Sequence, residues 1–141
     1  MPGIGYSSTE TSASLNDWEG GVVYDIEFDA ASNSGYNTAD DVYSWSHTCT
    51  GSDRYLLVGV SMLSVAGSSV GAVTYGGAPL ELIRAKTSAV GAVRAELWGL
   101  ANPLSGSNTI EVTLSAALDS IAGAVSLTGV QNRFSFEAAN D

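Results

Sequence analysis

Apolar and polar residues alternate one by one in several short runs, and this alternation limits the folds open to the chain. Residues 22–29, 42–50, 93–98 and 109–114 all follow the pattern. A period of two places alternate side chains on opposite faces of a strand, whereas a helix repeats every 3.6 residues. No segment of the sequence sustains the helical period. The chain is therefore expected to fold almost entirely into β-strands.

Glycine, proline and asparagine clusters separate these runs. Gly76-Gly77-Ala78-Pro79 indicates a hairpin between residues 70–75 and 80–83, and a second clear turn spans residues 102–106. Residues 30–41 are polar and are expected to form a loop. The expected strands cover residues 22–29, 42–50, 55–63, 70–75, 80–83, 93–98, 109–114 and 121–128, with a short last strand at Phe134 and Phe136. Eight or nine short strands predict an all-β, antiparallel two-sheet sandwich of jelly-roll or immunoglobulin-like type.

The alternation also predicts which side chains form the core. In residues 93–98 we expect Val93, Ala95 and Leu97 to face inward, with Arg94, Glu96 and Trp98 facing outward. Residues 55–63 are apolar on both faces, which is typical of a central strand that is covered on both sides. The predicted core consists of Tyr24, Ile26, Phe28, Trp45, Leu57, Val58, Val60, Val73, Leu80, Leu82, Leu97, Ile110, Val112, Leu114, Val125 and Leu127.

Charge divides the chain into two parts. Eight of the 15 acidic residues lie within the first 41 positions, where there is no Lys or Arg, and the formal net charge is −10. We therefore predict an acidic, Ser/Gly-rich N-terminal arm at residues 1–21, followed by one β-sandwich domain at residues 22–141. Only five basic residues are present, too few for a cationic patch. Nucleic acids and anionic membranes are therefore excluded as expected partners.

Several segments together resemble a known module. They are WSHT (45–48), RYLLVGVS (54–61), VTYGG (73–77), ELWGLANP (96–103), TIEVTLS (109–115) and AGAVSLTGV (122–130). The pattern is similar to a β-sandwich module found in large bacterial surface proteins and in some phage-encoded structural proteins. This resemblance implies a sandwich fold, and it brings no catalytic residues with it. Because few residues follow Val130, we expect the sheets to be completed either by the leading segment or by pairing of an exposed edge with a neighbouring chain.

Enzyme chemistry finds little support in the residues. His47 is the single histidine, and a Ser-His-Asp triad needs only one, but no Gly-x-Ser-x-Gly motif is present. We therefore expect His47 to be a structural residue and Cys49, the single cysteine, to be a small buried hydrophobe. Glu96 and Glu111, the candidates for a glycosidase pair, occupy outward strand positions in this interpretation. The chain is predicted not to be an enzyme.

Five carboxylates form the candidate metal ligands. Asp25, Glu27 and Asp29 share one strand face, and Asp40 and Asp41 follow downstream. Oxygen ligands of this kind suit Ca²⁺, although the spacing is not that of an EF-hand. A solvated acidic face that prevents promiscuous strand pairing explains the same residues and is the preferred interpretation. No cofactor is predicted, and Ca²⁺ is the alternative.

Large apolar side chains in polar surroundings are the candidate partner contacts. They are Ile4, Tyr6, Leu15, Trp18 and Trp98. Trp18 lies within the acidic arm, and an aromatic ring with a polar N–H suits an interface. Trp98 could pack at a sheet corner or subunit interface, or it could stack on a sugar ring if it is exposed.

These features together predict a non-enzymatic structural virion protein on the outer capsid surface. The specific prediction is a bacteriophage capsid decoration (cement) protein that binds the major capsid protein or other virion subunits. We expect a homo-oligomer, for which a trimer would fit the symmetry of such sites. The alternative is a carbohydrate-binding or adhesin module at the cell surface or outside the cell.

Overall fold

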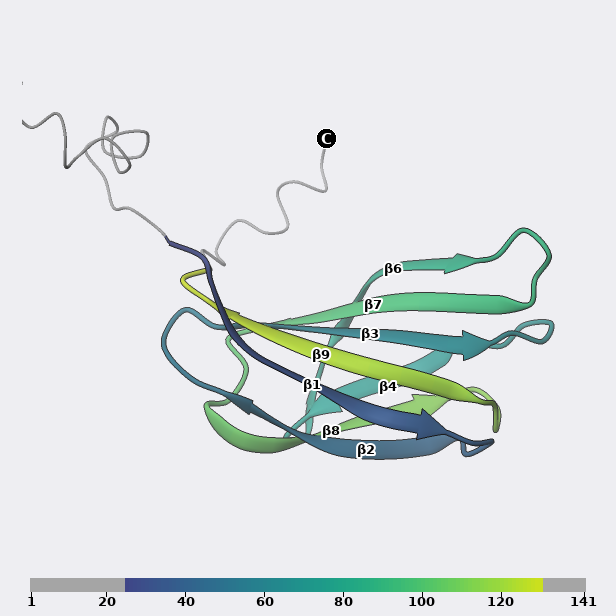
Figure 1. Cartoon of the computed structure of the whole chain (residues 1–141), viewed down its shortest axis with the longest axis horizontal. Coiled ribbons are helices and arrows are strands. Elements are labelled where there is room, and N and C mark those ends of the chain that lie inside the picture. The colour runs from purple at the N-terminus through teal and green to yellow at the C-terminus, as the bar shows by residue number, and fades with distance from the viewer. Residues whose placement is uncertain (1–24, 131–141) are drawn as a thin grey trace, which may run out of the picture.

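The structure, a computed structural model, describes residues 25–130 and consists of two antiparallel sheets packed face to face (Figure 1). The described part contains strands and turns but no helix. The strands are β1 (Glu27–Asn37), β2 (Val42–Cys49), β3 (Tyr55–Leu63), β4 (Val70–Tyr75), β5 (Ala78–Pro79), β6 (Glu81–Thr87), β7 (Val93–Ala101), β8 (Gly106–Leu114) and β9 (Ser120–Thr128). The prediction of an all-β two-sheet sandwich is confirmed.

The strand order is that of a jelly roll. One sheet runs β1-β9-β3-β7-β6 and the other runs β2-β8-β4-β5. Outer strands of the sequence pair with each other, as β1 does with β9 and β2 with β8, and inner strands pair inside them, as β3 does with β7 and β4 with β5. The strand pairs β1/β9 and β3/β7 lie in one sheet, and the pairs β2/β8 and β4/β5 lie in the other, as in a jelly roll. Gly76 and Gly77, both with positive φ, form the tight turn between β4 and β5.

The core lies between the two sheets. Alternate residues of the central strands β3 and β8 point into it, and the side chains of Leu56, Val58, Ile110 and Val112 are fully buried. Each such side chain contributes roughly 1.5–3 kcal/mol through burial of apolar surface. The predicted core residues that are buried are Val58, Val60, Val73, Leu80, Ile110, Val112 and Leu114.

The prediction for the first strand was wrong. Ile26 and Phe28, expected in the core, are 62% and 65% exposed. The polar loop expected at residues 30–41 is instead mostly strand, because β1 continues to Asn37. Bulges between Phe28 and Ala30 and between Asn33 and Tyr36 interrupt the period of two, so simple alternation does not identify the inward side chains.

The orientation of β7 is the reverse of the prediction. Glu96 and Trp98 are buried, whereas Val93 and Leu97 are 42% and 38% exposed. Both faces of this strand carry apolar residues, so the alternation alone does not say which set points inward. The burial of Glu96 depends on hydrogen bonds that a sequence pattern does not reveal.

Three further expectations need correction. The expected hairpin strand at residues 80–83 is divided: Ala78–Pro79 pair with β4 and the Leu80 N–H donates to Val73 O, and from Glu81 the chain continues in the other sheet as β6. Leu82 and Val125, expected in the core, are 48% and 36% exposed. Leu57, Leu127 and Trp45 are half-buried. The expected arm at 1–21, the start of the expected first strand at 22–24 and the expected strand at Phe134 and Phe136 lie outside the described residues.

Candidate functional site

The side of the five-stranded sheet that points away from the core is apolar. Residues paired across neighbouring strands share a face, and the pairs Leu57–Val125, Gly59–Leu97 and Ser61–Ile121 therefore lie on one side. This side, which we call the outer face, carries exposed hydrophobic residues from several strands. They are Ile83 of β6, Val93 and Leu97 of β7, and Ile121 and Val125 of β9. Exposed apolar residues gathered on one face are typical of a surface that contacts a partner.

A hollow of about 400 Å³ lies in the middle of the outer face. Its lining includes Asn33, Gly59, Ser61, Ala95, Ile121 and Gly123. A Cβ atom added to Gly59 would meet nothing within 4 Å, so the missing side chain leaves open space. Small residues on three neighbouring strands thus form a floor, with Ile121 rising at its side. The hollow can accept an apolar group from another segment.

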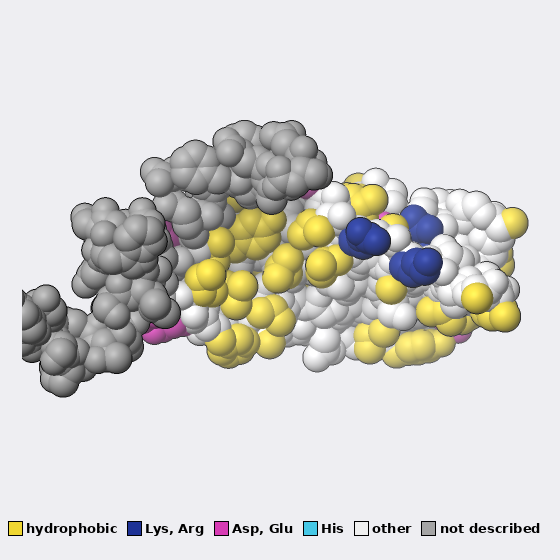
Figure 2. Space-filling view, turned by 90° about the horizontal axis from the view of Figure 1, so that it is seen from above, with side chains coloured by type: hydrophobic (Ala, Val, Ile, Leu, Met, Phe, Trp, Pro, Cys, Tyr) yellow, Lys and Arg dark blue, Asp and Glu magenta, His cyan; other side chains and the backbone are white. Residues whose placement is uncertain are grey.

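Two cations border the hollow on β6. Arg84 pairs with Leu97 and Lys86 pairs with Ala95, which places both cations on the outer face. Figure 2, seen from above, shows hydrophobic side chains beside a group of Lys and Arg side chains. Between residues 25 and 130, no ion pair joins Arg84 or Lys86 to a carboxylate. The outer face therefore offers both apolar contacts and positive charge in a protein whose net charge is −10.

His47 lies at the centre of a polar network that joins the two sheets. From β2, its Nδ1 lies 2.7 Å from Ser32 Oγ on β1, and its Nε2 lies 2.9 Å from Ser126 Oγ on β9. Ser126 donates to Asp29 Oδ2 at 2.7 Å. At the other end of the network, the Ser32 hydroxyl that contacts His47 Nδ1 also accepts a hydrogen bond from Trp45 Nε1 at 2.9 Å. Hydrogen bonds therefore close the side of the sandwich where β1 and β2 meet.

The donors and acceptors fix the tautomer of His47. Because the hydroxyl proton of Ser126 goes to Asp29, the Ser126 oxygen accepts from Nε2–H, which leaves Nδ1 as the acceptor for Ser32. Burial lowers the pKa of His47 below its usual value, and the negative charge of Asp29 only partly offsets this effect. Burial opposes ionisation of Asp29, but hydrogen bonds from the Thr50 side chain and backbone and from Ser126 outweigh it and lower the Asp29 pKa.

This network does not have the geometry of a nucleophilic triad. In a triad the histidine lies between the serine and the carboxylate, whereas here Ser126 lies between His47 and Asp29. The Ser126 side chain is fully buried, and His47 is 2% exposed. The arrangement orients side chains and holds sheets together, and it gives no substrate a path to Ser126.

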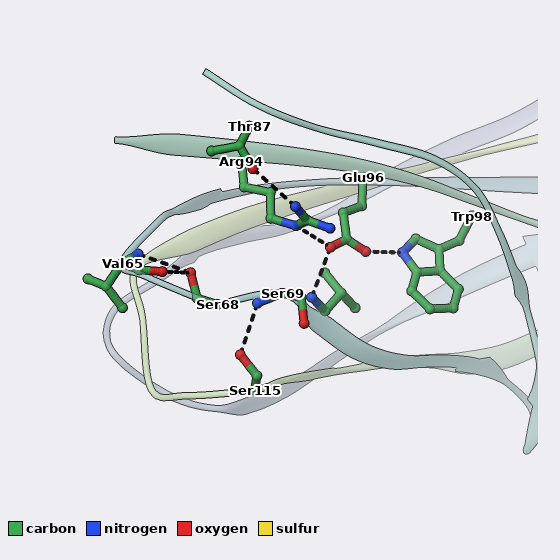
Figure 3. Close-up of polar contacts among 9 residues, drawn as sticks. Val65, Ser68, Ser69, Thr87, Arg94, Glu96, Trp98 and Ser115 are labelled. Atoms are coloured by element: carbon green, nitrogen blue, oxygen red, sulfur yellow. Dashed lines mark hydrogen bonds and ion pairs between the residues drawn. The ribbon is translucent and has the colours of Figure 1, made fainter. Parts of the chain in front are cut away.

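A second polar cluster surrounds the buried carboxylate of Glu96 (Figure 3). Its Oε2 accepts from Arg94 Nε at 2.6 Å and from the backbone N–H of Val70 at 3.1 Å, and its Oε1 accepts from Trp98 Nε1 at 3.0 Å. Arg94 also donates to Thr87 Oγ1 at 3.0 Å. Every oxygen of the buried carboxylate is therefore satisfied, which allows an acidic side chain to face the core.

A polar hollow of about 330 Å³ opens beside Arg94 at one end of the sandwich. Ser64, Ser68, Ser69 and Thr87 contribute to its lining. Several of these groups are already used within the loop, since Ser68 Oγ bridges the N–H and C=O of Val65. The positive charge of Arg94 is balanced by Glu96. The polar groups around this hollow are thus largely bonded to one another, within the loop and to Glu96.

The candidate calcium ligands do not come together. Asp29 turns toward Thr50 and Ser126 and away from the acidic row that the alternation predicted. Across the described ranges, no group of three or more His, Cys, Asp or Glu side chains could hold a metal ion. Asp25, Glu27, Asp40 and Asp41 are exposed.

The predicted partner contacts have different outcomes. Trp98 is 9% exposed and belongs to the core, so the prediction that it faces outward was wrong. Ile4, Tyr6, Leu15 and Trp18 lie outside the described residues. The outer face itself was missed as a site. The signal was present in residues 55–63, whose apolar character on both sides requires a cover on the outer side too.

A scan against family models found no match to this chain, and a search of curated proteins found none either. As for membranes, none of the elements in the described stretch is a helix long and apolar enough to cross a bilayer.

Proposed function

We propose that the protein is a non-enzymatic assembly subunit, a decoration protein of a bacteriophage capsid that binds neighbouring capsid subunits through its outer face. The apolar surface over β3, β7 and β9 carries this proposal. Leu97, Ile121 and Val125 are more than one third exposed there, around a hollow with a glycine floor. Covering such a surface releases water from apolar groups and stabilises a complex without any chemical step.

The fold and the charge support the same proposal. Jelly rolls build many viral capsid domains, although they also build lectins, so the fold alone does not assign a function. A net charge of −10 suits a protein on the outside of a particle better than one that lines packaged DNA. The resemblance to phage-encoded structural modules points in the same direction.

The carbohydrate-binding alternative loses its main candidate residue. Its prediction depended on an exposed Trp98 ring that could stack on a sugar. The indole ring instead packs in the core, and its N–H is bonded to Glu96.

Substitution on the outer face tests the proposal. Leu97→Asp places a charge at the rim of the hollow, on a side chain that already reaches solvent. We expect the variant to remain folded and to lose most of its binding to purified capsids of the same virus in a co-sedimentation assay. Such a large effect is expected because a charge buried in an apolar interface without a partner is strongly unfavourable.

Thr109→Asp is the matched control. Thr109 is an exposed strand residue of β8 in the four-stranded sheet, so the substitution adds the same charge to the opposite side of the molecule. Binding of the control should equal that of the unmodified protein. Equal binding of Leu97→Asp and Thr109→Asp to the capsids would refute the proposed interface.

A further inference from the structure

We infer that, in the free protein, the outer face is covered by the outer face of a second copy, in a two-fold symmetric dimer. In this dimer Leu97 of each copy lies over Gly59 of the other and fills its hollow. The two-fold axis runs roughly parallel to the strands, between β3 and β7. The inference goes beyond the proposed function because it concerns the free protein, in which a second copy occupies the face that a capsid subunit later takes.

The strand register shows why the outer face fits a copy of itself. One row across the sheet, from β1 to β6, consists of Asn33, Gly123, Gly59, Leu97 and Arg84. Two glycines therefore lie beside two long side chains. A two-fold axis between β3 and β7 places β7 of one copy over β3 of the other, and β6 over β9. Leu97 then lies opposite Gly59, and Arg84 lies opposite Gly123.

Gly59 leaves the space that the incoming Leu97 needs. A Cβ atom added to Gly59 would meet nothing within 4 Å, and the hollow around it measures about 400 Å³. The Leu97 side chain is 38% exposed, so it projects from its own sheet and is free to enter the hollow of another copy. The symmetry forms this contact twice, and both leucine side chains then lose their exposure to water.

The rows beside the hollow are also compatible with this arrangement. Ser61 pairs with Ala95 and Leu63 pairs with Val93 within one sheet, so the same residues face each other across the dimer. Small side chains thus meet in one row and apolar side chains in the next. Sheets that pack face to face lie about 10 Å apart with their strands within about 30° of each other, which agrees with an axis along the strands.

Charges on the outer face complement each other in the dimer. Lys86 of β6 lies in the row of Ala95, and Asp119 lies opposite Leu63 in the next row, because the Leu63 N–H donates to Asp119 O at 3.0 Å. Placing β6 over β9 therefore brings Lys86 of one copy to about 7 Å along the strands from Asp119 of the other. A lysine side chain spans that distance, and the symmetry forms the ion pair twice.

The outer face is also close to neutral, although the whole chain carries a formal charge of −10. In the rows from Leu57 to Leu63, the cations Arg84 and Lys86 are matched by Glu81 and Asp119. Repulsion between like charges therefore does not oppose contact of these two faces. The Arg84 stem can lie over Gly123 while its charged group reaches water at the edge of the sheet.

The area of contact is sufficient for a specific dimer. Strands β9, β3, β7 and β6 of each copy overlap, which gives a width of roughly 19 Å, and the nine residues of β3 give a length of roughly 30 Å. Each copy thus buries roughly 600 Å², or about 1,200 Å² in total, at the lower end of the range for specific complexes. A capsid subunit with a larger contact area can displace the second copy.

Sedimentation velocity of the full chain tests the inference. The unmodified protein should sediment at twice the monomer mass of 14.5 kDa at high concentration and dissociate on dilution. Leu97→Asp should sediment as a folded monomer, because its charge would be buried in the hollow of the other copy. The matched control Thr109→Asp, on the opposite sheet, should form the dimer as the unmodified protein does. Circular dichroism verifies that both variants are folded.

Three results would overturn the inference. They are a monomer at every concentration, a mass of three or more copies, and a dimer that Leu97→Asp leaves intact. These measurements contain no capsid, so they are independent of the proposed function. A monomeric protein whose capsid binding is lost in Leu97→Asp would leave only the proposed function standing, and a dimer without capsid binding would leave only this inference.

A charge exchange tests the orientation of the two copies. Lys86→Asp places two acids beside each other and should raise the Kd of the dimer roughly tenfold, since the contact occurs twice. Adding Asp119→Lys recreates the pair in reverse and should return the Kd to within about threefold of the original value. A doubly substituted protein that dimerises no better than Lys86→Asp alone would refute the Asp119–Lys86 contact and, with it, the proposed axis.

Discussion

The two sheets present different outer surfaces, although their inner surfaces form one core. Away from the core, the four-stranded sheet is lined by hydroxyl side chains, and Ser46 pairs there with Thr109 and Thr48 with Ser107. The five-stranded sheet instead exposes Leu97, Ile121 and Val125 around a hollow with a glycine floor. A Ser/Thr face is hydrated at little cost, whereas exposed apolar surface is unfavourable in water and is typical of a contact site.

The two opposite surfaces of the protein therefore differ in chemical character. The hydroxyl-rich sheet is suited to water, and the apolar sheet is suited to contact with protein. The asymmetry also explains why the orientation of β7 was mispredicted. A strand of the four-stranded sheet has one apolar side, whereas β7 has apolar residues on both, so its alternation does not define an inside.

The largest expected effect is on stability. Substitutions at two adjacent residues of β7, Glu96 on its inner side and Leu97 on its outer side, should reduce the free energy of unfolding by different amounts. Glu96→Ala removes the acceptor of Arg94 Nε, of the Trp98 indole N–H and of the Val70 backbone N–H, and should reduce the free energy of unfolding by about 3 kcal/mol. Leu97→Ala removes a partly exposed side chain and should cost about 1 kcal/mol. Urea denaturation of both variants gives the comparison. Equal losses would show that the outer face is as buried as the core.

The next effect is the pH dependence of the network that joins the sheets. The pKa of His47 is lower in the folded protein than its usual value of 6.5, so the unfolded chain takes up the proton first. Stability should therefore decrease as the pH falls below about 6.5. The Asp29 pKa is also lowered, and its contribution should be lost at more acidic pH, below about 4.

His47→Gln isolates the first of these two phases. The substitution removes the titrating ring and keeps a polar side chain between Ser32 and Ser126. Melting temperatures from pH 7 to pH 5 should then change less than in the unmodified protein, and the decrease below pH 4 should remain. An identical slope between pH 7 and pH 5 in both proteins would show that His47 does not carry this dependence.

The sequence was sufficient to predict the fold class and most of the central strands. The bounds of β3 and β4 were predicted correctly, because the turn residues around them are unambiguous and their apolar runs are continuous. The extent of β1 was not predicted, since its two bulges remove the alternation and its inward side chains are polar. The choice between a jelly roll and an immunoglobulin-like sandwich depends on long-range pairing, which local patterns do not encode.

The candidate sites were harder to predict for a related reason. His47 was expected to be a structural residue, but its partners Ser32 and Ser126 could not be identified, because they come from strands on either side of it in sequence. Glu96 was expected to be exposed because the alternation placed it on the side opposite Val93, Ala95 and Leu97. Only the structure shows the three donors that make its burial possible.

The smallest effect on stability tests the outer face most sharply. Gly59 has an ordinary strand conformation, and a Cβ atom there meets nothing within 4 Å. Gly59→Ala should therefore leave the fold intact and raise the free energy of unfolding by about 0.5–1 kcal/mol, because alanine loses less conformational freedom on folding. The added methyl group fills the floor of the hollow and should weaken whatever binds there. A variant that is more stable, yet binds capsids less well, would separate the function of the outer face from the stability of the domain, and undiminished binding would show that the hollow is not used.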